Sequence, residues 1–200
     1  MKKVCIVLVS TLVALLSMVA MASAVSFYPL PPPSEKGLPK AERPPSSAVG
    51  LYAASWQFES GGVAVTMSGT LATIESSVGK DYVLGAARNS IEGIDLWEIH
   101  ATRRMGKDLG IQVGEVTAEG ATDWQVAGLK SFRSKDAKKP WAADVGLGIY
   151  MPDGGDTAGQ AFVAGSYDIS KGITANLSVW SIAFQDLSVT RTAFGVGYRF

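Results

Sequence analysis

The chain ends in the stretch Thr192-Ala193-Phe194-Gly195-Val196-Gly197-Tyr198-Arg199-Phe200, in which apolar residues occupy every second position. Successive side chains of a β-strand point to opposite faces of the sheet. Phe194, Val196, Tyr198 and Phe200 would therefore share one face. The stretch predicts a final β-strand with one wholly apolar side that ends in an aromatic residue.

This stretch resembles the C-terminal assembly signal of bacterial outer-membrane β-barrels, in which alternating apolar residues end in Phe. The resemblance implies that Phe194, Val196, Tyr198 and Phe200 form such a signal and that the chain lies in the bacterial outer membrane. It also implies two partners, the outer-membrane lipid and the barrel assembly machinery. The final strand of a secreted, soluble β-sandwich is the alternative interpretation at this point.

The first residues predict export. Lys2 and Lys3 precede a nearly continuous apolar run over 4–20, and Ala22-Ser23-Ala24 has the small-x-small pattern of a cleavage site. Residues 1–24 are therefore predicted to be a secretory signal peptide. Cys5 is the only cysteine and lies inside it, so we expect no disulfide after cleavage.

Residues 25–48 are predicted to form an extended tail. Seven of the nine prolines lie between Pro29 and Pro45. Proline fixes φ and cannot donate to a strand ladder, so this segment favours neither helix nor strand. It could serve as a leader that keeps the first strand clear, a spacer, a lumen plug, or a docking segment for a periplasmic partner.

Residues 49–200 read as short alternating runs separated by turn residues, which predicts an all-β fold. The expected architecture is a single antiparallel transmembrane β-barrel of about ten strands, with eight or twelve as alternatives. An even number of strands places both termini on the periplasmic side. The expected strands are 51–58, 63–75, 80–88, 93–103, 109–118, 123–132, 141–151, 158–169, 172–183 and 188–200.

Some details of this pattern are less regular. Gly69 interrupts a poorly alternating run and suggests a bulge or bend. Residues 89–92 are expected to form a turn. Glu115 and Lys130 share a face with apolar residues, so each would have to lie near a membrane boundary, where a charge costs little.

The charge balance excludes one class of function. Removal of Lys2 and Lys3 with the signal peptide leaves 16 basic and 18 acidic residues. This balance gives no electrostatic case for nucleic-acid binding. No later stretch approaches the ~18 consecutive apolar residues of a transmembrane helix.

Catalytic chemistry is also hard to assemble from this sequence. His100 is the only histidine, and the chain has no HExxH motif, no paired cysteines and no phosphate-binding loop. We therefore predict no catalytic, cofactor or metal site, and no enzyme activity. A barrel enzyme that uses His100 as its base is the alternative.

A lumen network is expected instead. Glu98 and His100 lie on the expected strand 93–103, and Arg104 follows it directly. These three residues share one parity, opposite Trp97 and Ile99, and would point into the barrel. Buried charges need partners, so we predict a polar network in the lumen. Its further members, on other strands, would be Asp144, Asp168, Arg191 and Arg199.

The sequence thus predicts an integral outer-membrane barrel with a structural or interaction role. A narrow channel for small solutes is the main alternative. Inward-facing glycines could leave room for water in such a channel; they are Gly146, Gly148, Gly195 and Gly197.

Overall fold

The computed structural model describes residues 47–105, 108–134 and 141–200. The predicted signal peptide and nearly all of the predicted tail lie outside these residues. Within the described ranges we find no helix long and apolar enough to cross a membrane. The strands are β1 Ser47–Ser60, β2 Val63–Val78, β3 Tyr82–Ile91, β4 Ile94–Arg104, β5 Leu109–Ala118, β6 Ala121–Arg133, β7 Trp141–Met151, β8 Ala158–Ser170, β9 Ile173–Ala183 and β10 Leu187–Arg199.

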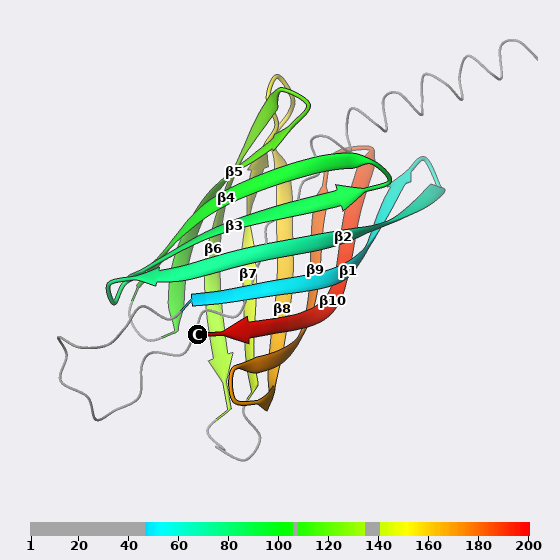
Figure 1. The fold of residues 1–200 in the computed structure, drawn as a ribbon. Coiled ribbons are helices and arrows are strands. Elements are labelled where there is room, and N and C mark those ends of the chain that lie inside the picture. The colour runs from blue at the N-terminus through cyan, green and yellow to red at the C-terminus, as the bar shows by residue number, and fades with distance from the viewer. Residues whose placement is uncertain (1–46, 106–107, 135–140) are drawn as a thin grey trace, which may run out of the picture.

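These ten strands form one closed antiparallel barrel in which each strand pairs with its neighbours in the chain and β10 pairs with β1 (Figure 1). The register partner of Ser47 on β2 has its own partner on β3, and so on around the barrel. This series of partners returns to β1 at Glu59 and not at Ser47, so the strands are staggered. This stagger tilts the strands strongly, as closure of a barrel requires. The predicted fold class and strand number are confirmed.

The barrel has two distinct ends. We call the end that carries the β1–β2, β3–β4, β5–β6, β7–β8 and β9–β10 connections the turn end. The opposite end, the terminal end, holds both ends of the described barrel: Ser47 and Phe200 exchange two backbone hydrogen bonds there, of 3.0 and 2.9 Å.

Three connections at the turn end are two-residue turns in which both residues have positive φ: Gly61-Gly62, Glu92-Gly93 and Glu119-Gly120. Positive φ at both positions marks the type I′ turn, whose twist matches that of the flanking strands. The turn predicted over 89–92 is therefore wrong in its position. Asn89 and Ile91 belong to β3, and the turn itself is only Glu92-Gly93.

The bulge expected at Gly69 is also wrong. The register of β2 with both neighbours runs without interruption through Gly69, and a register irregularity lies instead between Asp168 and Ser170 on β8. A Cβ on Gly69 would lie 2.2 Å from the Ser90 carbonyl oxygen. Glycine is needed here because the backbones of β2 and β3 approach closely.

The poor alternation at the start of β2 has a structural cause. Residues 63–66 are exposed on both faces, because this part of the β1–β2 hairpin projects past the β3–β4 turn. Alternation begins where β2 joins the closed wall. From Leu71 onward its odd-numbered residues are buried in the lumen, and Ile74 and Val78 are exposed on the outside.

Candidate functional site

The outer surface of the barrel is an apolar belt. The outward residues of nearly every strand are large and apolar; they include Leu51, Ile74, Leu84, Ile99, Val113, Leu147, Val163, Leu177 and Val196. Aromatic side chains lie toward the terminal end of the same surface: Tyr82, Phe132, Trp141, Tyr167, Tyr198 and Phe200. Trp97 and Trp124 are the aromatic residues toward the turn end. An apolar band between aromatic girdles is the surface of a barrel that sits in a lipid bilayer.

Several charged residues on this surface have partners. Glu115 accepts a hydrogen bond from Thr117 (3.3 Å), and Lys130 Nζ lies 3.9 Å from Asp108 at the terminal end. Arg88 donates to Asp95 at 2.6 Å, and its guanidinium lies over the Trp97 ring. Glu115 and Lys130 thus lie toward opposite ends of the barrel.

The C-terminal strand contributes to the belt directly. Phe194, Val196, Tyr198 and Phe200 are all exposed on the outer face of β10. The rings of Tyr198 and Phe200 stack with their centroids 6.1 Å apart. The residues with the assembly-signal pattern therefore form one continuous outward surface at the closing seam with β1.

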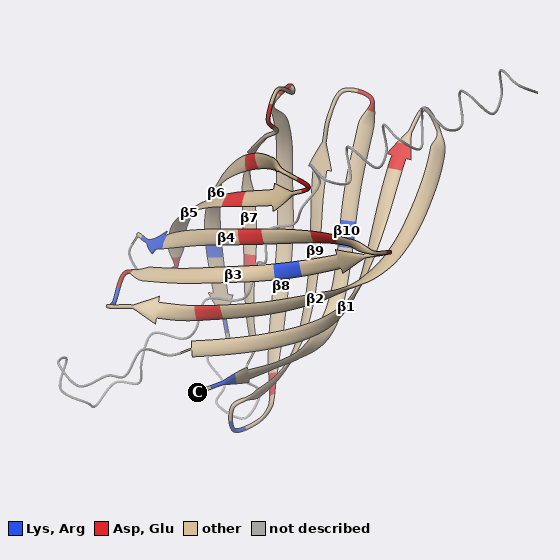
Figure 2. Cartoon of the chain, turned by 45° about the horizontal axis from the view of Figure 1, so that its top comes forward, with Lys and Arg blue, Asp and Glu red and all other residues tan. Residues whose placement is uncertain are grey.

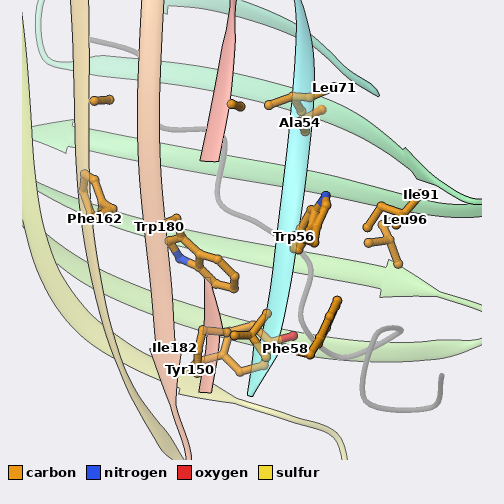
Figure 3. Close-up of a cluster of buried hydrophobic side chains, with 14 of the residues drawn as sticks. Ala54, Trp56, Phe58, Leu71, Ile91, Leu96, Tyr150, Phe162, Trp180 and Ile182 are labelled. Atoms are coloured by element: carbon orange, nitrogen blue, oxygen red, sulfur yellow. The ribbon is translucent and has the colours of Figure 1, made fainter. Parts of the chain in front are cut away.

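The lumen is blocked near the turn end by an aromatic layer, which we define as Trp56, Phe58, Tyr150 and Trp180 (Figure 3). Trp180 meets Trp56 and Tyr150 edge to face, with centroids 6.3 and 6.4 Å apart. Aliphatic side chains surround this layer, among them Leu71, Ile91, Leu96 and Ile182. Trp56 and Trp180 are 0% exposed, so no water-filled passage touches them.

Arg191 lies within this layer rather than with the other charged residues. Its Cζ is 5.5 Å from the Trp56 ring centroid and 5.9 Å from that of Trp180. Its Nη1 donates a hydrogen bond to Asn89 across the lumen (3.3 Å). A desolvated guanidinium over indole faces gains cation–π energy that partly offsets its burial.

Polar groups of the layer are tied to the wall. The Trp180 indole N–H donates to Gln160 Oε1 (3.2 Å), and Gln160 Nε2 donates to the Ile149 carbonyl (3.1 Å). The Tyr150 hydroxyl donates to Asp123, which also accepts from the Asp153 amide at 2.9 Å. These bonds hold the rings of Trp180 and Tyr150 in position, whereas the buried Trp56 indole N–H has no hydrogen-bond partner among the described residues.

His100 lies between two carboxylates in the middle of the lumen. Its Nε2 is 3.5 Å from Glu75 and its Nδ1 is 3.5 Å from Glu98. Gln125 donates to Glu98 as well, at 3.4 Å. We call Glu75, Glu98, His100 and Gln125 the histidine cluster; all four are at most 5% exposed.

The remaining predicted lumen residues lie nearer the terminal end, and all of them except Asp144 are less enclosed. Arg199 donates to Asp168 (3.0 Å) and to Ser166 (3.2 Å). Arg104 is half-buried, and Asp144 is buried. The seven predicted network residues are therefore distributed over three places: the histidine cluster, the Arg191 position in the aromatic layer, and the terminal mouth.

The inward glycines do not leave room for water. A Cβ on Gly146 would lie 1.8 Å from the Phe162 ring, and a Cβ on Gly195 would lie 2.7 Å from a carbon of Tyr52. His100 and Gln125 cover Gly85 and Gly114 in the same way. The expectation of free space beside Gly146 and Gly195 is wrong, because large side chains from neighbouring strands occupy it.

Charge differs between the two ends (Figure 2). The described turn-end connections carry Glu92, Glu119, Asp153, Asp156 and Asp186, and these turn residues include no Lys or Arg. The β1–β2 and β9–β10 turns also line a shallow hollow of about 490 Å³ that includes Glu59 and Asp186. At the terminal end, basic side chains include Lys80, Arg103, Arg104, Arg133, Lys171 and Arg199.

Sequence reasoning missed several of the residues that fill the lumen. Trp56 and Trp180 share the parity of lumen residues on their strands, yet their apolar character suggested no lumen role. Glu75 was placed at a strand end, and Asn89 in a turn. Alternation followed residue by residue along β2 and β3 would have placed Glu75 and Asn89 on the lumen face.

No protein-family model matches the sequence, and no curated protein matches it. The fold is similar to that of several solved barrels. Ail of Yersinia pestis, in complex with the heparin analogue sucrose octasulfate, is 10% identical with a TM-score of 0.40, over 78% of this chain and 99% of that chain. The KdgM porin in complex with oligogalacturonate is 13% identical (TM-score 0.43, 77% and 99%). The outer membrane protein OprG of Pseudomonas aeruginosa is 8% identical (TM-score 0.38, 78% and 95%).

The conclusion follows from the geometry of the chain itself. A closed antiparallel wall leaves no unpaired backbone within the bilayer, and an apolar belt with aromatic margins faces outward. Polar and aromatic side chains fill the inside. The chain is an integral β-barrel of the bacterial outer membrane.

Proposed function

We propose that this barrel is a closed, non-conducting membrane protein with a structural or interaction role. The observation that carries the proposal is the aromatic layer, in which Trp56 of β1 and Trp180 of β9 pack against each other inside the lumen with no exposed surface. Small barrels fill their interior with side chains, whereas wide ones leave an aqueous channel. The filled glycine positions support the same conclusion.

Conductance across a planar lipid bilayer tests this proposal. The wild-type chain, inserted from detergent, is expected to give no stable single-channel steps. The double variant Trp56→Ala, Trp180→Ala removes the centre of the layer and is expected to give them. Stable steps from the wild-type chain would instead support the narrow channel, with the histidine cluster on its path.

The closed lumen also supports a role without catalysis. His100, the base that a barrel hydrolase would need, is 3% exposed and lies between Glu75 and Glu98. A general base must come within hydrogen-bond reach of its substrate. Replacement of His100 would abolish hydrolysis of a lipid or peptide substrate if the enzyme alternative held.

We further propose that Phe194, Val196, Tyr198 and Phe200 form the signal that the barrel assembly machinery binds. Their continuous outward surface at the β1–β10 seam supports this role. Deletion of Phe200 is expected to lower the amount of folded barrel in the outer membrane, measured by the gel mobility of unboiled samples. Unchanged amounts would contradict the assembly signal.

The same assignment gives the barrel its orientation. With the assembly signal at the terminal end, that end faces the periplasm and the turn end faces the cell exterior. Ser47 opens β1 at the terminal end, so a periplasmic partner of the preceding proline-rich residues would meet the chain there. Protease added to intact cells should then cleave only engineered sites at the turn end.

A further inference from the structure

One edge of β2 is unpaired at the turn end. Its residues 63–68 pair with β1, from Ser60↔Val63 to Ser55↔Ser68. Pairing of β2 with β3 begins only at Gly69↔Ile91, and no other strand of the described chain pairs with residues 63–68. Figure 1 shows the β1–β2 hairpin projecting beyond the β3–β4 turn.

The composition of this edge favours strand pairing. The sequence Val63-Ala64-Val65-Thr66-Met67-Ser68 contains no charge and no proline and is rich in β-branched residues. Exposed edges in soluble regions are usually protected by Lys, Pro or a bulge. Here the β1–β2 register is uninterrupted, and Val63 is 66% exposed. The edge is a regular, open template for another strand.

The surrounding charge selects the kind of strand. Glu59 is the register partner of Ala64, near the tip of the hairpin, and Glu92 follows Ile91, where the free edge ends. Carboxylates therefore flank the edge at both ends. Together with the acidic turns around it, they attract a cationic segment and repel an acidic one.

Charge and position argue against two other occupants. A second copy of this chain would bring two acidic turn ends together, which costs electrostatic energy. Ser47, where the described chain begins, lies at the opposite end of the barrel, and the aromatic layer closes the passage between the two ends.

We propose that the free edge of β2 over residues 63–68 binds an extended, basic segment of another protein by strand addition at the cell surface. This inference rests on the orientation and the interaction role proposed above. Backbone hydrogen bonds to the edge supply the affinity, and Glu59 and Glu92 select Lys or Arg side chains.

The test uses the full barrel in phospholipid vesicles and a fluorescein-labelled peptide of about eight residues with alternating Lys and Val. Fluorescence anisotropy is expected to show saturable binding at the exposed turn end. Two matched peptides serve as comparisons. Methylation of alternate backbone nitrogens, or replacement of Lys by Glu, is expected to weaken binding about tenfold or more, since several hydrogen bonds or the charge attraction are lost.

Variants of the protein locate the site. Val65→Pro and Thr66→Pro are made separately, because adjacent residues of a strand direct their amides to opposite edges. One proline therefore removes an amide that faces β1, and the other removes an amide of the free edge. The variant that still folds, judged by gel mobility, is the one that has lost the free-edge amide, and it is expected to lose peptide binding. Gln57→Lys and Thr66→Lys form a charge-matched pair at registered positions, and only Thr66→Lys lies on the free edge.

Several results would overturn the inference. Equal binding of the N-methylated peptide would show simple charge attraction, and unchanged binding by the folded proline variant would place the peptide elsewhere. Concentration-dependent dimers that Thr66→Lys abolishes would assign the edge to a second copy. The conductance experiment is independent of these results, so a failure of peptide binding leaves the closed-barrel proposal to be judged separately.

Discussion

The Arg191 guanidinium of β10 lies over the Trp56 ring of β1, with Cζ 5.5 Å from the ring centroid, and both side chains are fully buried. The pair joins the two strands that close the barrel, since Trp56 and Arg191 are also register partners. This one contact thus belongs both to the seam that closes the wall and to the layer that fills the lumen.

A matched pair of arginine variants tests this contact. Arg191→Gln removes a desolvated cation–π contact and is expected to lower the free energy of unfolding by about 2 kcal/mol or more. Arg88 also lies over a tryptophan, Trp97, but half of its side chain is exposed. Arg88→Gln should therefore have a much smaller effect.

Reversible urea unfolding in lipid vesicles, followed by tryptophan fluorescence, measures both variants. Arg191→Lys is the informative third variant, because it keeps the charge but loses the planar group. If Arg191→Gln were no more destabilising than Arg88→Gln, the contact would be incidental to stability.

The ten strands could be predicted because nearly all of them alternate with a period of two and each turn contains Gly or charged residues. The outward parity of Ile99 and the inward parity of His100 follow from alternation alone. In the structure their exposed fractions are 66% and 3%. A strand in a closed wall has only two faces. Once the alternating apolar residues identify the lipid face, the residues between them must face the lumen.

The interior could not be predicted in the same way. Alternation places Trp56 and Arg191 on the lumen face, and closure of the barrel makes their strands neighbours, but alternation does not give the register that makes the two residues partners. Nor does it give the axial positions of residues on different strands, which depend on the stagger of the whole barrel. The seven residues expected in one network therefore lie at three places along the lumen.

The parity of β4 gives a second prediction. Ile99→Arg places a charge on the lipid face, where the register partners of Ile99 are Ala86 and Glu115. Near the bilayer midplane this costs about 2–4 kcal/mol. Ile99→Leu is the control and should change the free energy of unfolding little. A milder effect of Ile99→Arg would place this position close to the interface.

The filled lumen gives a third prediction. A Cβ on Gly146 would overlap the Phe162 ring, so Gly146→Ala is expected to destabilise the barrel by about 1–3 kcal/mol. Phe162→Leu in the same chain should recover part of this loss. Gly128→Ala is the control on the outer face, where the nearest atom is the Leu147 carbonyl oxygen at 3.9 Å, and it should be nearly neutral. Equal effects at Gly146 and Gly128 would mean that Phe162 can move aside.

The histidine cluster gives the last prediction. Glu75 and Glu98 approach His100 from β2 and β4, each at 3.5 Å, and all three side chains are buried. His100→Leu removes the group that lies between two carboxylates and leaves them enclosed together. Because an uncompensated buried charge is costly, we expect a loss of about 3–5 kcal/mol in the free energy of unfolding.

Removal of the carboxylates in the same chain should reverse this loss. Glu75→Gln and Glu98→Gln, combined with His100→Leu, replace both acids with neutral amides of similar shape. We expect the triple variant to be more stable than His100→Leu alone, because a neutral amide has a lower desolvation cost than a carboxylate. If the triple variant were instead the less stable of the two, hydrogen bonds of the glutamates with other wall residues would outweigh their contact with His100.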